Sequence, residues 1–208
     1  LEFRLLNALR PGDTTATGQR LEASVGLVSC LEALRPHWRD ALDAASETKD
    51  GATRRGIGIG CMGYGLGNTA LSNPSTLRVA LAADGALTLY SGAVDIGQGA
   101  NTIVTQICAD ALGVPVDRFR LVTGDTDLTA DAGKTSASRQ TFVSGKAAQL
   151  AGEDLRRTIL RQVNAGPEAR IELVGARLRV IDGDASHDID LAGAALTGEG
   201  TFDPPTTP

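Results

Sequence analysis

The residues best suited to bind a ligand follow an apolar stretch at residues 87–94. The run Asp95-Ile96-Gly97-Gln98-Gly99 stands between that stretch and a helical pattern beginning near Thr102. Glycines let a ligand approach the backbone, and the N–H groups of a helix start, with the Gln98 amide, offer donors to oxo or phosphate oxygens. A tight turn before a core helix explains the same residues, so this motif alone leaves both interpretations open.

A second group of polar side chains stands at the predicted start of a long helix. Residues 134–141 (KTSASRQT) supply hydroxyls, a guanidinium and an amide. Ser136 or Ser138 acting as an N-cap explains the serines without a ligand. Arg139 needs another reason, because a cation in the first turn opposes the helix dipole, and it indicates an anionic partner or an acidic neighbour. Two donor-rich helix starts suit a polyanionic ligand, provided that Gln98 and Ser138 face one shared cleft.

Other apparent motifs lack the flanking elements or the residue spacing that their binding function requires. Residues 58–63 match GxGxxG but lack a preceding hydrophobic strand and a following helix, and a phosphate loop ending at Gly133-Lys134-Thr135 would need glycine where Leu128 stands. Residues 125–127 lack the spacing of a calcium loop and are interpreted as a turn. The three cysteines lie far apart without CxxC spacing, so we expect neither a disulfide framework nor a zinc site, and we predict a reducing cytoplasm.

Composition excludes several classes of partner. The 208 residues are 42% hydrophobic, enough for a core, and carry a net charge of −5, which disfavours nucleic acid. No apolar run approaches the roughly 20 residues of a membrane span. The first residues carry no apolar segment of a secretory signal and no initiator Met, which predicts an excised segment of a longer chain.

Periodicity predicts an α+β fold, a mixed sheet with hairpins packed against one long and one or two shorter helices. We expect an N-terminal loop and amphipathic helix over residues 1–50 and an α+β segment over residues 51–208, because residues 44–55 have no apolar period. The expected elements are an amphipathic helix within residues 19–42, strands from residue 56 with a hairpin turn at Asp84-Gly85, a helix over 102–112, a strand over 119–123, a helix over 138–163, a hairpin within 170–191 and an irregular tail.

The order of these motifs resembles the large, molybdenum-binding subunit of the xanthine dehydrogenase and aldehyde oxidase family. The resemblance spans nearly the whole chain. The matching residues are Phe3-Arg4, Asn7, Gly12-Asp13, Thr14, Thr17-Gly18-Gln19, Gly97-Gln98-Gly99, Thr102, Gln106, Ala109, Leu112-Gly113, Asp125-Thr126, Thr135 and Ala137-Ser138-Arg139.

The resemblance implies a molybdopterin-binding α+β domain, with Gln98 near the molybdenum oxo ligand and residues 137–140 at the pterin and phosphate end. Arg139-Gln140 resembles the pattern associated with the cytosine dinucleotide form of the cofactor. The residues expected to bind the cofactor are Gly97, Gln98, Gly99, Thr135, Ala137, Ser138, Arg139 and Gln140.

The family reaction is hydroxylation of an aldehyde or an N-heterocycle with oxygen from water, assisted by a glutamate acting as base. Glu199 in Gly198-Glu199-Gly200 is only a superficial candidate for that base, so no catalytic or metal-ligating residue is assigned. The resemblance implies the remainder of the subunit, iron–sulfur and FAD subunits or domains, and a small-molecule substrate as partners. We expect the isolated chain to be inactive, to be empty of cofactor as purified and to form homo-oligomers through exposed apolar surface.

Two alternatives stay open at this point. One is a stand-alone α+β binding or interaction domain without catalysis, which keeps its glycine loops for their turns. The other is a degenerate, chaperone-like relative of the family.

Overall fold

The computed structural model describes residues 1–47, 51–191 and 195–206 of the chain. The chain divides into two compact units, Leu1–Gly63 and Tyr64–Pro208. The boundary predicted between residues 50 and 51 adjoins residues outside the described ranges, and it stays a prediction.

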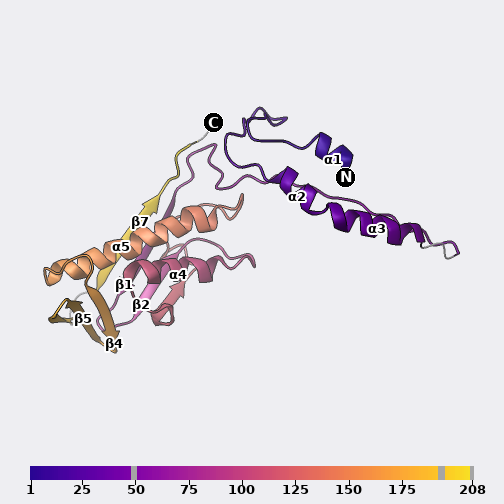
Figure 1. Ribbon diagram of the computed structural model, residues 1–208. Coiled ribbons are helices and arrows are strands. Elements are labelled where there is room, and N and C mark those ends of the chain that lie inside the picture. Colours follow the sequence, from indigo (N-terminus) through magenta and orange to yellow (C-terminus); the bar gives the residue numbers. More distant parts are fainter. Residues whose placement is uncertain (48–50, 192–194, 207–208) are drawn as a thin grey trace. The chain divides into compact units, whose positions relative to one another are not determined.

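The first unit consists of three helices with a small apolar cluster (Figure 1). These helices are α1 (Glu2–Leu6), α2 (Leu27–Ala33) and α3 (Arg35–Glu47). The buried residues of the cluster are Leu5, Ala8 and Leu31. The single helix expected within residues 19–42 is not formed, because two helices, α2 and α3, lie in and beyond that range. Residues 12–21 instead form a loop closed by backbone bonds, and the helix is interrupted at Leu34 because Pro36 has no N–H to donate to Glu32.

The second unit is built on a four-stranded mixed sheet. Its strands are β1 (Ser75–Leu81), β2 (Leu87–Ser91), β3 (Phe119–Val122) and β7 (Leu196–Phe202), in the order β3-β2-β1-β7. β1 pairs antiparallel with β2 and β7, and β2 pairs parallel with β3. The turn between β1 and β2 contains Gly85 at φ +81°, so the predicted hairpin turn is confirmed.

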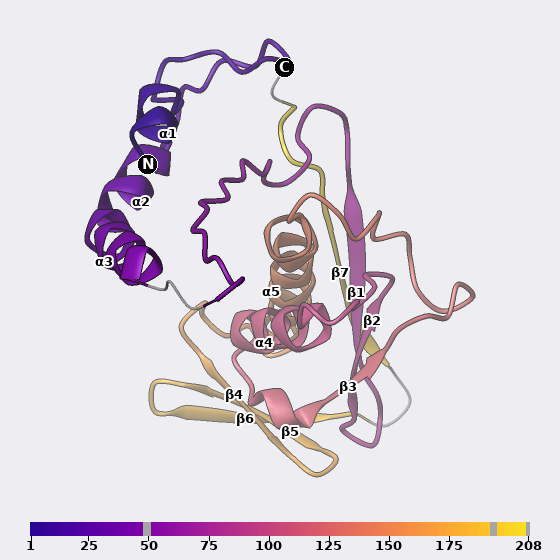
Figure 2. The same ribbon diagram turned by 90° about the vertical axis from the view of Figure 1, so that its right-hand side faces the viewer.

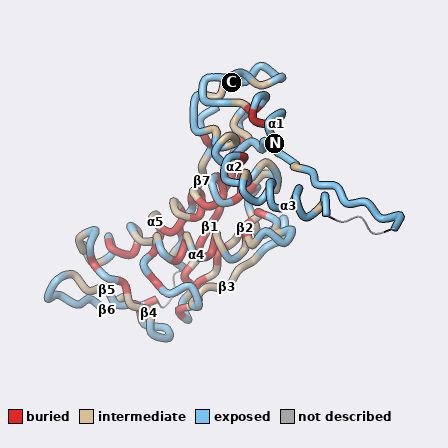
Figure 3. Tube along the Cα trace, turned by 45° about the vertical axis from the view of Figure 1, so that its right-hand side comes forward, coloured by how far each residue is buried: buried red, intermediate tan, exposed pale blue. Residues whose placement is uncertain are grey.

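Two helices cover one face of this sheet (Figure 2). They are α4 (Ala100–Leu112) and α5 (Gly145–Gln162), and a π-helical turn, η2 (Gln140–Ser144), leads into α5. β1 and β2 alternate buried with half-buried residues. Their buried side chains form one core cluster with buried residues of α4 and α5, and the buried positions of β1 and α5 are red in Figure 3. A short 3-10 helix, η1 (Val116–Arg118), joins α4 to β3. The α+β fold, with one long and shorter helices against a mixed sheet, is confirmed.

A separate three-stranded antiparallel sheet follows α5. It contains β4 (Arg170–Val174), β5 (Arg177–Asp182) and β6 (Ala185–Asp190) in that order, and so has one strand more than the predicted hairpin. Ile171, Leu178 and Val180 bury its apolar face in the main core.

Two expectations about strands are wrong. Ile57 and Ile59, predicted to be in a strand, lie in an irregular segment. The tail predicted to be irregular instead contains β7, which pairs with β1 along its whole length. β7 has little β-forming character because Gly198 and Gly200 lie within it, yet both glycines are needed there. A Cβ on Gly198 would lie 2.4 Å from the carbonyl oxygen of Ala151, and one on Gly200 would lie 2.3 Å from that of Ala147.

Candidate cofactor-binding site

The loop between β2 and α4 is stabilised by the carboxylate of Asp95. Its two oxygens accept hydrogen bonds from the backbone N–H groups of Gly97 at 2.8 Å, Asn101 at 3.1 Å and Gly99 at 3.3 Å. These bonds lower the pKa of the Asp95 carboxyl. The expectation that the N–H groups at this helix start are free is therefore wrong for these three residues, because a carboxylate of the chain already binds them.

The Gln98 side chain folds over the same loop. Its Oε1 accepts from the N–H of Ile96 at 2.7 Å, and its Nε2 donates to the carbonyl of Val94 at 3.3 Å. An amide nitrogen carries two hydrogens, so one donor of Gln98 is left for a ligand. Gly97 and Gly99 lie at φ +107° and +80° and shape the turn that presents Gln98.

The second loop, residues 134–141, has an unusual backbone. Ala137 and Ser138 both lie in the left-handed region, at φ +50° and +51°, which costs a non-glycine residue on the order of 1–3 kcal/mol. The carbonyl of Ala137 accepts from the N–H of Gly67 at 2.9 Å, and its own N–H donates to the hydroxyl of Tyr64 at 3.2 Å. These contacts hold a strained peptide at the entrance of η2.

The Arg139 side chain lies beneath this loop and is fully buried, with 0% of its surface exposed. Nη1 donates to the carbonyls of Ala132 at 2.5 Å and Lys134 at 3.0 Å, and Nη2 donates to those of Asn73 at 2.9 Å and Pro74 at 3.0 Å. Nε has no partner among the described residues. Arg139 therefore binds backbone carbonyls, where the sequence suggested an anionic or acidic partner.

Burial lowers the pKa of the Arg139 guanidinium, and the nearby charge of Asp131 opposes this effect. The guanidinium makes no ion pair with a carboxylate in the described part of the chain. A buried cation without an ion-pair partner raises the potential of the loop above it, which favours an anion there.

A chain of hydrogen bonds runs from the first loop through Thr135 and Gln140 to β1. The Thr135 hydroxyl donates to the carbonyl of Val94 at 2.7 Å, and Gln140 Nε2 donates to Thr135 Oγ1 at 2.7 Å. Gln140 Oε1 accepts from Ser144 at 2.6 Å, and Ser144 accepts from buried Ser75 on β1 at 3.0 Å. Because each partner is fixed, the orientation of the Gln140 amide is fixed as well.

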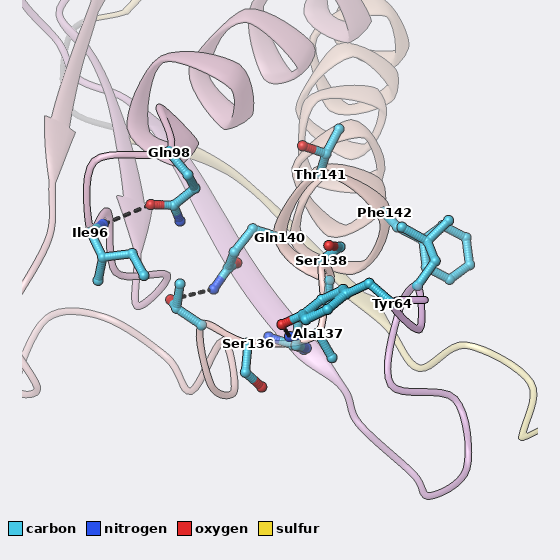
Figure 4. A pocket seen from close by; sticks show the side chains of 12 residues that line it. Tyr64, Ile96, Gln98, Ser136, Ala137, Ser138, Gln140, Thr141 and Phe142 are labelled. Carbon is cyan, nitrogen blue, oxygen red and sulfur yellow. Dashed lines mark hydrogen bonds between the residues drawn. The ribbon is translucent and has the colours of Figure 1, made fainter. Parts of the chain in front are cut away.

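Both loops open into one pocket of about 740 Å³ (Figure 4). Gln98 and Ser138 therefore share a cleft, as the cofactor interpretation requires. The hydroxyls of Ser136 and Ser138 are exposed and have no hydrogen-bond partner among the described residues. The lining residues are Tyr64, Leu66, Ile96, Gln98, Thr135, Ser136, Ala137, Ser138, Arg139, Gln140, Thr141 and Phe142.

Of the residues predicted from the sequence, Gln98, Thr135 and residues 137–140 meet in this pocket, whereas Gly97 and Gly99 do not line it. Sequence reasoning missed Tyr64, Leu66 and Phe142. Their signal was weak, because Tyr64 and Leu66 stand in a glycine-rich segment far from either polar motif. Glu199 lies on β7 outside the pocket, with its N–H donating to Asp154.

Comparison with known proteins decides the family. Residues 32–205 match the molybdopterin cofactor-binding domain. The chain belongs to this family. The chain is 36% identical over 165 residues to a xanthine dehydrogenase molybdenum-binding subunit of Escherichia coli O157:H7, a match covering 77% of the chain and 22% of that relative. It is 34% identical over 160 residues to an aldehyde oxidoreductase of Megalodesulfovibrio gigas, covering 74% of the chain and 17% of that protein.

Solved structures agree with this assignment. The aldehyde oxidoreductase of Desulfovibrio desulfuricans superimposes with a TM-score of 0.70 at 25% identity, covering 98% of the chain and 21% of that structure. The chain spans about a fifth of the length of the curated relatives it matches. Within the described ranges, no helix is long and apolar enough to cross a membrane, and no three His, Cys, Asp or Glu side chains gather as metal ligands.

Proposed function

We propose that the chain binds the molybdopterin cofactor of a molybdenum hydroxylase through the pocket shared by Gln98 and residues 135–141. The chemistry of the lining residues supports this. Among the described residues, the lining holds hydroxyl and amide groups and one buried cation, Arg139, and no acidic side chain. Such a surface suits a ligand rich in anionic oxygen, since neutral donors meet the oxygens and the cation offsets their charge.

Each predicted residue then has a distinct part. Gln98 donates its remaining amide hydrogen, and Ser138 donates its hydroxyl. Ala137 and Arg139 contribute mainly through the backbone of the loop. Thr135 joins the two loops, and Gln140 holds the Thr135 hydroxyl in place. Gly97 and Gly99 keep the first loop in the shape that presents Gln98. The first N–H groups of η2 lack intrahelical acceptors and are further donors.

The cofactor, when bound, supplies the redox chemistry for oxidising an aldehyde or N-heterocycle with oxygen derived from water. We propose that the chain is a segment of a larger cytoplasmic oxidoreductase, whose remaining molybdenum subunit, iron–sulfur and FAD subunits or domains complete the enzyme. Within the chain itself, residues 1–50 and residues 51–208 are proposed as two separate parts. The cytosine dinucleotide form of the cofactor is favoured by the Arg139-Gln140 pair, and the isolated chain is expected to be inactive, to be empty of cofactor as purified and to self-associate.

The test is to purify the longest natural protein that contains this chain and measure its molybdenum and acid-released nucleotide. We expect stoichiometric molybdenum and cytidine 5′-monophosphate in the wild type, and a large loss of both in Gln98→Ala and Ser138→Ala variants that keep their fold. Full metal and nucleotide content in both variants would contradict the proposed site. Another released nucleotide would contradict only the cytosine form.

A further inference from the structure

The carboxylate of Asp203 clamps the chain just before β1. Asp203 follows β7 directly, and the ladder of β1 and β7 ends one residue before it. On the side of β1 the next residue, Pro74, has no N–H with which to continue the ladder. The Asp203 side chain binds there instead, because Oδ1 accepts from the N–H of Asn73 at 2.8 Å and Oδ2 accepts from the Ser72 hydroxyl at 2.6 Å. These bonds lower the pKa of the Asp203 carboxyl, so it carries a negative charge at neutral pH.

Asn73 extends this clamp into the interior of the unit. Only 7% of its surface is exposed. Its carbonyl accepts from Nη2 of Arg139 at 2.9 Å, and its side-chain Nδ2 donates to the carbonyl of Gly67 at 2.7 Å. Asn73 is therefore bonded to a carboxylate on one side and to a buried guanidinium on the other, and hydrogen bonds to charged groups are stronger than those between neutral groups.

The two inner bonds end on the strained part of the second loop. Gly67 donates its N–H to the carbonyl of Ala137 at 2.9 Å, and Arg139 directly follows Ser138 in the chain. Ala137 and Ser138 adopt left-handed φ values of +50° and +51°, which persist only where the surroundings fix them. The clamp therefore reaches these two residues by two routes, through Gly67 and through Arg139.

We propose that Asp203 is a positioning residue for cofactor binding, which acts through Asn73 to keep Ser138 turned toward the pocket. Asp203 itself does not line the pocket. This inference rests on the proposed function, in which the Ser138 hydroxyl is a donor to the cofactor. When the carboxylate is removed, Asn73 loses its anchor at the end of β7, and Ala137 and Ser138 lose part of what holds their strained backbone.

The first experiment observes the second loop in the 208-residue chain without a ligand. NMR spectra give the Cα and Cβ shifts of Ala137 and Ser138, and the dispersion of the spectra reports folding. For Asp203→Ala we expect these shifts to move away from left-handed values and the guanidinium protons of Arg139 to exchange with solvent about tenfold faster, the size expected for one lost hydrogen bond. Asp203→Asn keeps one oxygen acceptor for the Asn73 N–H, so it should restore most of the wild-type signals. Because Asp203 is exposed, both variants should fold.

Asp182→Ala is the matched control. The Asp182 carboxylate also accepts from the backbone N–H of a residue apart in the chain, that of Gly166 at 2.7 Å, and it does not line the pocket. A general loss of stability would change the loop signals in both alanine variants. We expect Asp182→Ala to leave the signals of Ala137 and Ser138 at their wild-type values.

The second experiment measures how firmly the longest natural protein that contains this chain retains the cofactor. Its molybdenum content is followed during dialysis. We expect Asp203→Ala to lose the metal several-fold faster than the wild type, and we expect Asp203→Asn and Asp182→Ala to lose it at nearly the wild-type rate.

The outcomes separate this inference from the proposed function. Wild-type loop signals in Asp203→Ala, or the same change of signals in Asp182→Ala, would overturn the role of Asp203 and leave the cofactor site standing. Altered loop signals with an unchanged rate of molybdenum loss would also overturn it, because the loop conformation would then not govern cofactor binding. Failure of the proposed function would appear independently of Asp203, as full metal content in Ser138→Ala or as wild-type protein without molybdenum, and the inference would fail with it.

Discussion

Gln98 and Thr135 donate to the same acceptor, the carbonyl oxygen of Val94, with donor–acceptor distances of 3.3 Å and 2.7 Å. This single oxygen joins two loops separated by about forty residues. Val94 lies three residues after the end of β2, so the sheet constrains the position of the acceptor, and the two loops are placed relative to the sheet as well as to each other. The convergence of the polar motifs thus has a definite structural cause.

Thr135→Val should loosen this junction. The substitution removes the donor to the Val94 carbonyl and the acceptor of Gln140 Nε2. We therefore expect the free energy of unfolding to fall by about 1–2 kcal/mol and phosphate-bearing ligands to bind several-fold more weakly. Urea unfolding should be followed by far-UV circular dichroism, because Trp38, the one tryptophan, lies in the other unit.

Thr129→Val is the matched control. Its hydroxyl also donates to a backbone carbonyl, that of Asp125, at 2.7 Å, and Thr129 does not line the pocket. We expect a similar loss of stability with unchanged ligand affinity. If both variants bound ligand like the wild type, the junction would have no part in shaping the site.

Arg139→Lys should show that the guanidinium shapes the loop. Lysine keeps the charge but cannot donate to four carbonyls on two segments, so we expect a loss of about 3 kcal/mol in stability and a marked loss of ligand affinity. Arg156 is a suitable comparison, because it also binds backbone carbonyls, those of Leu112, Pro167 and Ala169, outside the pocket. Arg156→Lys should destabilise the chain without a specific effect on binding, and equal effects of the two substitutions on binding would contradict the role of Arg139.

The sequence predicted the elements whose own periodicity specifies them. The helix near residues 102–112 ends at Gly113, which adopts the left-handed conformation at φ +84°, and the turn at Gly85 forms as expected. β7 could not be found this way, because its glycines are selected by contact with α5 and not by strand propensity. Packing against α5, and not local sequence propensity, determines where β7 forms.

The candidate site shows the same division. The polar motifs around Gln98 and Ser138 were visible because donors cluster at helix starts. The use of those donors was not visible: Asp95 was not expected to bind the N–H groups of its own loop, nor Arg139 to bind carbonyls. Such pairings depend on loop geometry, which residue spacing alone does not specify. Tyr64 reaches the site only through folding, from 73 residues before Ala137.

Gly200→Ala should test the close approach of β7 to α5. The added methyl group would lie 2.3 Å from the carbonyl oxygen of Ala147 and 2.4 Å from the nitrogen of Ala151, and backbone atoms cannot yield as a side chain does. We expect a loss of roughly 1–3 kcal/mol, measured by urea unfolding. Gly58→Ala, with nothing within 4 Å of its added Cβ, should stay within about 0.5 kcal/mol of the wild type. Equal stability of the two variants would mean that β7 packs less closely than the structure indicates.

The carboxylate of Asp95 should make stability depend on pH. Hydrogen bonds from Gly97, Asn101 and Gly99 lower its pKa in the folded state, so the folded chain binds this proton less readily than the unfolded chain. The stabilisation is therefore complete above the ordinary carboxyl pKa of about 4 and is lost as the pH falls through the lower, folded value. Asp95→Asn should lower the urea midpoint at pH 7 and flatten its decline in acid. Asp84→Asn, whose carboxylate accepts from one N–H in the exposed turn after β1, is the control. If Asp95→Asn kept the full acid dependence of the wild type, other carboxylates would have to account for it.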